Sequence, residues 1–254
     1  MRRSRKSANE MTFLEHLEDL RKRIFVSFLA VAAGIIPGWI LSKPLYEILA
    51  RPLTQALPEG TKLVFTRLTD PFMVYMKVSI LASIFFTAPI LFFQLWKFIA
   101  PGLYKKEKKY VLPFVFFSTL FFAGGASFGY FIMYPWACRF FINIGSDFQS
   151  MIVISDFLNF TLKFLLGIAL IFEMPTLVFF LAKLGIVSAS WMVRKFKYAV
   201  LVIFIIAAII TPTPDMINQT ILAVPMIVLY WLSILVAWLV GKKKKKKAEE
   251  EMSG

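Results

Sequence analysis

Six long runs of apolar residues, separated by short charged segments, constrain the fold of this chain more than any other feature. The runs cover about residues 24–42, 72–96, 111–134, 157–184, 198–211 and 217–240. Five of them reach the roughly 20 residues that a helix needs to cross a hydrocarbon core. The fifth has about 14 residues, or roughly 21 Å of helix, so it must thin the bilayer or sit in a recess lined by protein.

These runs predict an all-α integral membrane protein, with residues 1–254 forming a single membrane domain of six transmembrane helices. The mean hydropathy is +0.72 and 59% of the residues are hydrophobic, values that soluble domains rarely reach. The single cysteine, Cys138, has no partner for an intramolecular disulfide. The single histidine, His16, has no second ligand at metal-binding spacing. We therefore predict no metal site, no cofactor and no enzymatic activity.

The distribution of lysine and arginine predicts the orientation in the membrane. Most of the 29 basic residues fall in four segments: residues 1–23, the loop 97–109, residues 194–197 and the tail 242–254. The six runs bring these segments to one side, which the positive-inside rule identifies as cytoplasmic. Both termini are therefore expected in the cytoplasm. The net charge of +14 indicates contact with anionic lipid rather than with nucleic acid.

Helix-capping patterns predict where two of the helices begin. Thr12-x-x-Glu15 is a capping box, and it opens a helix whose apolar face suits the cytoplasmic interface. We expect residues 1–23 to form this amphipathic segment, which leads into the first span. Asp70-Pro71 is expected to cap the second span, since aspartate is a good N-cap and proline is favoured at the first helical position.

Polar and proline positions mark the loops on the far side of the membrane. The loop 43–71 is long enough to form a lid there. Asp156 can cap the fourth span and Asp215 the sixth, and Gln219 follows Asp215 by one turn. The far-side candidates are Pro52, Asp156, Asp215 and Gln219.

The motif HLEDLRKR brings Asp19 and Arg21 to a position just before the first span. Its spacing favours ordinary i,i+4 ion pairs on a solvated helix face, Asp19 with Arg23 and Glu18 with Lys22. A functional interpretation, in which Asp19 accepts an arginine from another protein, stays open beside this structural one.

The segment QLWKFIAPGLYKKEKKY, residues 94–110, connects the second and third spans. Glu107 is the one acid among five lysines of this segment, and it can simply relieve their repulsion. Alternatively, it is a carboxylate held ionised by its neighbours, ready for the planar, bidentate guanidinium of an arginine. Phe98, Pro101 and Leu103 would then supply an apolar shelf beside it.

Glu173 lies inside the apolar run LLGIALIFEMPTLVFFLA, residues 165–182. An acidic residue at membrane depth costs roughly 2.5–3.5 kcal/mol on insertion scales, so it marks function by default. We expect a polar anchor on a lipid-facing or groove-facing surface that awaits a partner helix, with Gln94 as a weaker member of the same polar cluster. The alternative is a protonated acid that is hydrogen-bonded to a neighbouring helix.

Four motifs together resemble the TatC family, the multispanning core of the twin-arginine protein translocase. They are HLEDLRKR before the first span, FIAPGLYKKEK between the second and third, FEMP in the fourth, and TPTPDMINQTILAVP leading into the sixth. The resemblance runs from His16 to the end of the sixth span. Six spans with both ends cytoplasmic and a short fifth span also match the family.

The resemblance implies a function in the bacterial inner membrane. Family members bind the twin-arginine signal peptides of folded cargo proteins at the cytoplasmic face. They recruit single-span TatA-type and TatB-type partners into multi-copy complexes, and export uses the proton-motive force. No G-x-x-x-x-G-K-[ST] nucleotide-binding motif occurs in the chain. The energy for export is therefore expected to come from a source other than nucleotide hydrolysis by this chain.

The family's functional positions can be carried over residue by residue. They fall on Asp19, Phe98 and Glu107 for the signal peptide, on Glu173 inside the membrane, and on Pro52 and Asp215 on the far side. Asp19 departs from the family's usual glutamate and offers a shorter arm. Lys106 stands where histidine is frequent, which argues against an imidazole role there.

Two other classes of protein remain as alternatives. A proton-coupled secondary transporter of small solutes would use Glu173 as proton carrier, and it predicts further ionisable groups around a cavity near the midplane. An intramembrane enzyme needs a second catalytic group at the depth of Glu173, and the spans offer no obvious one.

Overall fold

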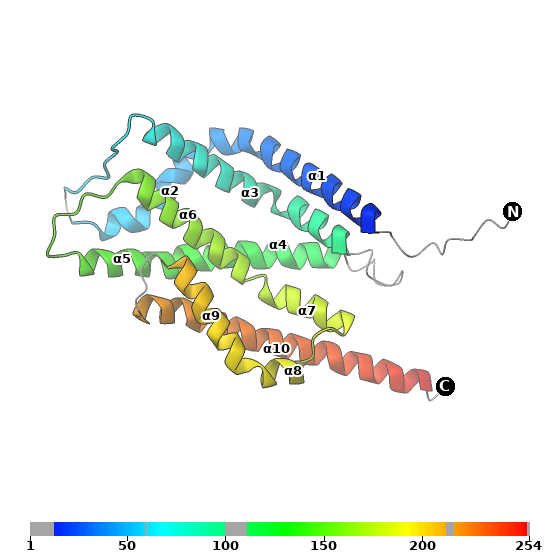
Figure 1. Ribbon diagram of the computed structural model, residues 1–254. Helices are drawn as coiled ribbons and strands as arrows, with labels where there is room; N and C mark the ends of the chain where they lie inside the picture. Colours follow the sequence, from blue (N-terminus) through cyan, green and yellow to red (C-terminus); the bar gives the residue numbers. More distant parts are fainter. Residues whose placement is uncertain (1–12, 59, 100–110, 212–215, 253–254) are drawn as a thin grey trace.

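The computed structural model describes residues 13–58, 60–99, 111–211 and 216–252, which are almost entirely helical (Figure 1). The elements are α1 (Phe13–Ile40), α2 (Ser42–Ala56), α3 (Asp70–Ile99), α4 (Val111–Phe128), η3 (Gly129–Met133), α5 (Tyr134–Ile144), α6 (Ile154–Ile171), α7 (Met174–Leu184), α8 (Ala189–Arg194), α9 (Phe196–Ile210) and α10 (Met216–Met252). Within the described ranges the β-type pairing is confined to an isolated bridge between Val64 and Val153.

All six predicted spans are helical. Helices α1 and α3 form the first two spans, α4 with η3 and α5 the third, α6 with α7 the fourth, α9 the fifth and α10 the sixth. Five of these are long and apolar enough to cross a membrane, whereas α9 is shorter. With 15 residues, α9 measures about 22 Å, so the prediction of a short fifth span is confirmed.

The two ends of the described chain lie at the same end of the bundle (Figure 1). We call this end, where α1 begins and α3, α7 and α10 finish, the basic end; the opposite end is the far end. Across the bundle α1 packs on α3, α3 on α4, α4 on α6, and α7 on α10, with α9 against α10. The spans therefore form a continuous layer of neighbours from α1 to α9.

The far-side segment 43–71 is more ordered than the predicted lid. Its first part is helix α2, which packs on α3 and α5. The buried face of α2 includes Leu49, Pro52 and Leu53. The rest of the segment is fixed by Val64, whose backbone N–H donates to the Ile152 carbonyl at 3.0 Å. The expectation that the whole segment is a loop was wrong, because its first part forms the amphipathic helix α2, which buries its apolar face on the bundle.

The predicted caps of the second and fourth spans are also corrected. Asp70 opens α3, but its carboxylate accepts the backbone N–H groups of Thr66 and Arg67, at 3.2 and 3.0 Å. It therefore closes the turn before the helix rather than capping the helix itself. Helix α6 has Val153 at its N-cap position without a side-chain cap, and Asp156 lies in its first turn.

The fourth span breaks at Phe172 and Glu173, between α6 and α7. Pro175 stands in the first turn of α7. Proline has no backbone N–H, and its ring clashes with the carbonyl four residues earlier, so a continuous helix is disrupted here. The Glu173 backbone N–H donates to Leu170 at 3.1 Å, a three-residue spacing that tightens the last turn. As a result, α7 begins as a new helix directly after Glu173.

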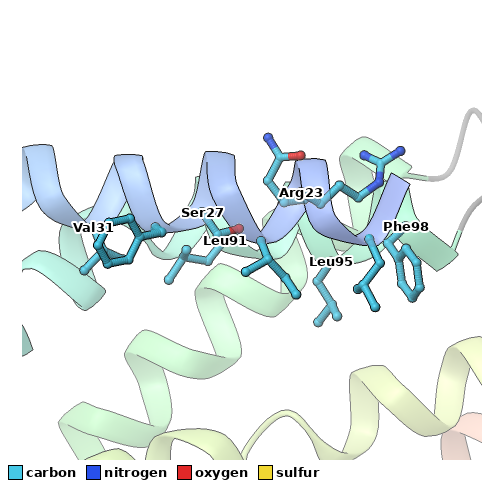
Figure 2. A pocket seen from close by; sticks show the side chains of 10 residues that line it. Arg23, Ser27, Val31, Leu91, Leu95 and Phe98 are labelled. Atoms are coloured by element: carbon cyan, nitrogen blue, oxygen red, sulfur yellow. The ribbon is translucent and has the colours of Figure 1, made fainter. Parts of the chain in front are cut away.

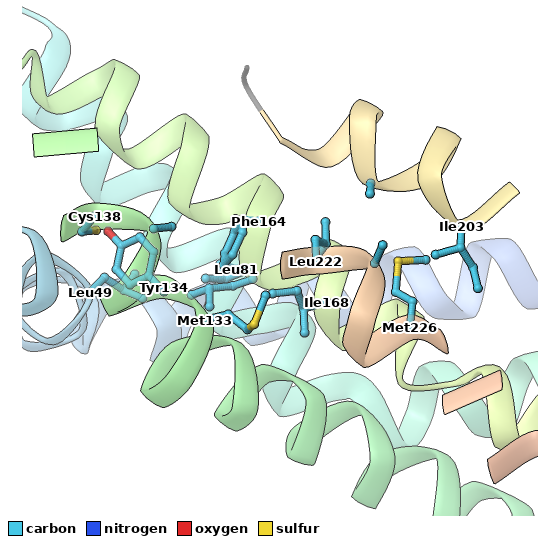
Figure 3. Close-up of a cluster of buried hydrophobic side chains, with 14 of the residues drawn as sticks. Leu49, Leu81, Met133, Tyr134, Cys138, Phe164, Ile168, Ile203, Leu222 and Met226 are labelled. Carbon is cyan, nitrogen blue, oxygen red and sulfur yellow. The ribbon is translucent and has the colours of Figure 1, made fainter. Parts of the chain in front are cut away.

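The largest apolar core joins the second to sixth spans and α2. Tyr134 and Leu158 are fully buried in it, and the Tyr134 hydroxyl lies 2.8 Å from Thr161 Oγ1. Figure 3 shows side chains of η3, α6, α9 and α10 meeting there, among them Met133, Phe164, Ile168, Ile203, Leu222 and Met226. This core holds the pair α9–α10 against the rest of the bundle.

The Gly125-x-x-x-Gly129 pattern of the third span predicts a close helix crossing, and it faces α6. A Cβ on Gly125 would lie 2.7 Å from the Cβ of Phe172 and 3.0 Å from the Cα of Ala169. The neighbouring Gly124 has open space around the same position. Two adjacent glycines therefore differ completely in what an added methyl group would meet.

Replacing Gly125 with alanine should lower the thermal unfolding temperature of the purified protein in detergent. The added methyl group must push α4 away from α6, and overpacking of this kind costs roughly 1–3 kcal/mol. The matched control is Gly124→Ala, which should be neutral or slightly stabilising because alanine favours helix. Equal unfolding temperatures for the two variants would show that the α4–α6 contact is not tight.

Candidate functional site

The described part of the predicted signal-peptide site lies at the basic end of α1 and α3. Asp19 Oδ2 accepts a hydrogen bond from Arg23 Nε at 2.7 Å, so one of the two predicted i,i+4 pairs is confirmed. The other pair, Glu18 with Lys22, is not formed among the described residues. Arg21, two residues beyond Asp19, is exposed. The aspartate already holds a guanidinium, which shows that its geometry suits this group.

A groove of about 400 Å³ runs between α1 and α3 beside this ion pair. Figure 2 shows Arg23 and Phe98 at one end of it, with Ser27, Leu91, Leu95 and Val31 following along the two helices. The walls are mainly apolar, and Gln94 adds a polar group. The groove thus offers an apolar surface with a charged group at one end. This arrangement suits a bound peptide that has a basic part followed by an apolar part.

Three further residues of the predicted site, Pro101, Leu103 and Glu107, lie outside the described residues. Phe98 is the last of the set that is described, and it is half-buried in the groove. Because α3 packs directly on α1, the chain enters residues 100–110 next to the helix that carries Asp19. Asp215 of the far-side set also falls outside the described residues.

Glu173 lies at the break of the fourth span, and it is 5% exposed. The carboxyl group neighbours the Ser118 hydroxyl and the backbone of Phe122, both on α4. One carboxyl oxygen, Oε1, is buried without a hydrogen-bond partner. The expectation of a lipid-facing or groove-facing anchor is therefore wrong for this conformation, because the break turns the side chain inward against α4.

The polar surroundings of Glu173 include Ser118 on α4, and Ser118 in turn contacts α3. The indole Nε1 of Trp96, on α3, donates to Ser118 Oγ at 3.1 Å, and both side chains are buried. Trp96 also stacks on Phe114, with ring centroids 4.9 Å apart. The hydrogen bond between Trp96 and Ser118 therefore ties α3 to α4 beside the break that carries Glu173.

Thr176 is a second buried polar group with an unfilled hydrogen-bonding capacity. It is 4% exposed, and its Oγ1 has no partner. Thr176 lines an apolar cavity of about 270 Å³ between α4, α7 and α10, together with Phe117, Phe179 and Val236. Two oxygen atoms three residues apart in the chain, the Glu173 Oε1 and the Thr176 Oγ1, are therefore buried without a hydrogen-bond partner, and Thr176 also lines this cavity.

Gln94 does not join Glu173 as expected. It lines the α1–α3 groove, whereas Trp96, two positions later, turns toward α4. Sequence reasoning missed Trp96, Ser118 and Thr176. The signal that could have revealed the last two is a hydroxyl residue inside an apolar run, since such a residue needs a partner when it is buried in a membrane.

The far-side candidates are spread over different helices. Pro52 is buried inside α2, Asp156 is exposed in the first turn of α6, and Gln219 is half-buried near the start of α10. No group of three or more His, Cys, Asp or Glu residues that could hold a metal ion occurs in the part of the chain described above.

Comparisons with known proteins agree on one family. The family model described as Sec-independent protein translocase protein (TatC) matches residues 15–225. A relative of that name from Koribacter versatilis is 47% identical over all of this chain and 96% of its own length. The TatC of Campylobacter jejuni is 41% identical, over 93% of this chain and 97% of its own.

The fold agrees as well. A crystal structure described as the twin arginine translocase receptor TatC matches with a TM-score of 0.78 and 31% identity, over 89% of this chain and 100% of its own. A second crystal structure, of the receptor in the detergent DDM, matches with a TM-score of 0.79. Sequence and fold lead to one conclusion: the chain belongs to the TatC family of Sec-independent protein translocase proteins.

Proposed function

We propose that this protein binds twin-arginine signal peptides at the basic end of α1 and α3 and nucleates the complex that exports their folded cargo. As a TatC-family protein it is an integral inner-membrane component of a translocase and not an enzyme. Its partners would be single-span TatA-type and TatB-type subunits in a multi-copy complex, and the proton-motive force would drive export.

The observation that carries this proposal is the position of the Asp19–Arg23 pair at the charged end of an apolar groove. Asp19 is only half-buried, and Arg23 Nε bonds its Oδ2. A carboxylate has two oxygens and about four acceptor sites, so Asp19 can accept an arginine of a signal peptide beside Arg23. The apolar part of the signal peptide would then lie along the groove that Phe98 begins.

A second arginine needs a second acceptor, and Glu107 is the candidate. It belongs to the segment that follows α3, and α3 packs on α1. Charge-assisted bonds from a planar guanidinium are directional and often bidentate. Two acidic acceptors would therefore discriminate two arginines from two lysines by geometry rather than by charge alone.

Asp19→Asn and Glu107→Ala should each weaken binding of an Arg-Arg signal peptide about 10- to 100-fold, because each removes a charge-assisted bond. Each should also reduce the preference over a Lys-Lys peptide. The measurement is crosslinking of both peptides to the full-length protein in membranes. Glu18→Gln is the matched control, since it removes an exposed acid adjacent to Asp19. An unchanged Arg-Arg preference in both test variants would disprove the assignment.

Glu173 is the proposed contact for a polar group on a partner helix. Its Oε1 and the Oγ1 of Thr176, three residues later in the chain, are both buried without a hydrogen-bond partner. An unpaired polar group in this setting costs free energy, and a hydrogen-bonding side chain from a partner helix would relieve that cost. Thr176 lines the cavity between α4, α7 and α10, and the proposed helix would approach from that side.

Glu173→Ala should abolish crosslinking to a single-span partner, whereas Glu173→Gln should retain most of it, because an amide oxygen can accept the same hydrogen bond. Gln94→Ala, which changes a polar residue of the α1–α3 groove, is the control and should leave the crosslink intact. Unchanged crosslinking and export in Glu173→Ala would mean that Glu173 is a buried structural acid.

The solute-transporter alternative is not favoured. It predicted further ionisable groups around a cavity at the midplane. Lys77 is instead engaged by Asn159, with Nζ 2.7 Å from Oδ1, and the cavity lined by Thr176 is almost entirely apolar. Membership in a family of protein translocases agrees with this result.

A further inference from the structure

The short fifth span leaves a recess in the basic end of the bundle. Helix α8, which leads into α9, is held to α10 by the Tyr230 hydroxyl, which donates to the Met192 carbonyl at 2.9 Å. Tyr230 precedes Lys242 by twelve residues of α10, or about 18 Å. The end of α8 is therefore held deeper in the bundle than the position at which the lysines of α10 begin.

A groove of about 1040 Å³ opens between α8 and α10 at this recess. Its α10 wall runs from Val228 to Trp238, a length of about 15 Å. This is half of a hydrocarbon core of ~30 Å, the depth of a single leaflet. Several of the apolar wall residues are strongly exposed: Val193, Val228, Trp231, Leu235 and Trp238.

The polar groups around the groove are cationic or neutral. Arg194 and Ser190 line it, and Lys242 Nζ lies 5.4 Å from the centre of the Trp238 ring at its outer end. Lys195 and Lys197 both lie near Tyr198, at 5.2 and 5.0 Å from its ring. None of these cations forms an ion pair with a carboxylate in the described ranges.

We propose that this groove binds an anionic phospholipid of the leaflet at the basic end. The phosphate would lie at the outer end of the groove beside Lys242, Arg194 would add positive charge from the groove wall, and an acyl chain would lie along the apolar wall of α10. Basic pockets between transmembrane helices on the cytoplasmic side suit anionic headgroups. Tryptophans at the membrane interface suit the boundary between headgroup and chain.

The cations beside the groove favour an anionic lipid over an apolar partner helix. The groove is about one leaflet deep, which suits an acyl chain, and Arg194 and Lys242 lie at positions where a headgroup can use their charge. Unpaired cations also select against the zwitterionic lipids, which bring no net negative charge. The bound lipid would fill the space that α9, with 15 residues, is too short to fill.

The test uses the full-length protein in phosphatidylcholine nanodiscs that contain a small fraction of brominated phosphatidylglycerol. Bromine on the acyl chain should quench Trp231 and Trp238 more than the same fraction of brominated phosphatidylcholine does. The variant Arg194→Gln/Lys242→Gln should lose this preference, by roughly fivefold for each cation removed. Trp231→Phe/Trp238→Phe should lose the excess quenching but still retain phosphatidylglycerol in native mass spectrometry.

Lys43→Gln/Lys62→Gln is the matched control, since it removes two exposed lysines from the far end and should keep the preference. Equal quenching by the two brominated lipids would overturn the proposal and leave the groove to another occupant, such as a partner helix. An excess that persists in Arg194→Gln/Lys242→Gln, or that the far-end control also loses, would overturn it as well.

Discussion

Inside a hydrocarbon layer every backbone N–H and C=O must find a partner within the protein, and the irregular turns of this bundle obey that constraint. The fourth span breaks after Ile171, but the break is pressed against α4, where Gly125 lets Phe172 approach. The third span passes through the π-turn η3 without losing helical bonding. The break at Glu173 is therefore covered by a neighbouring helix, and the π-turn keeps hydrogen bonds of its own.

The covered break explains why a costly carboxyl group can be buried at this depth. The carboxyl group lies beside Ser118, whose hydroxyl accepts a hydrogen bond from the Trp96 indole, so its immediate surroundings are partly polar. The remaining Oε1 is unpaired, and full satisfaction would need a further donor. A structural role and a partner-binding role are thus compatible, because the Oε1 atom is left without a hydrogen-bond partner.

Much of this architecture could be predicted from the sequence, for identifiable reasons. The lengths of the apolar runs predicted the six spans. The fifth run, with about fourteen residues, was too short for a full crossing, and α9 indeed has 15 residues. Helix α2 was missed because its apolar residues form one face of a polar-looking, proline-containing segment. The inward turn of Glu173 was missed because Pro175 was not read as a helix break, and rotation at a break changes which face a side chain occupies.

The pairwise contacts could not be read from the sequence because they depend on which helices become neighbours. Gln94 and Trp96 illustrate the point, since two positions of one helix face α1 and α4 respectively. The three proposed binding sites are likewise formed by different neighbouring helices. The charged end of the α1–α3 groove, the polar set at Glu173 and the groove at α8–α10 lie on different helix pairs. A signal peptide, a partner helix and a lipid could therefore bind without competing for the same side chains.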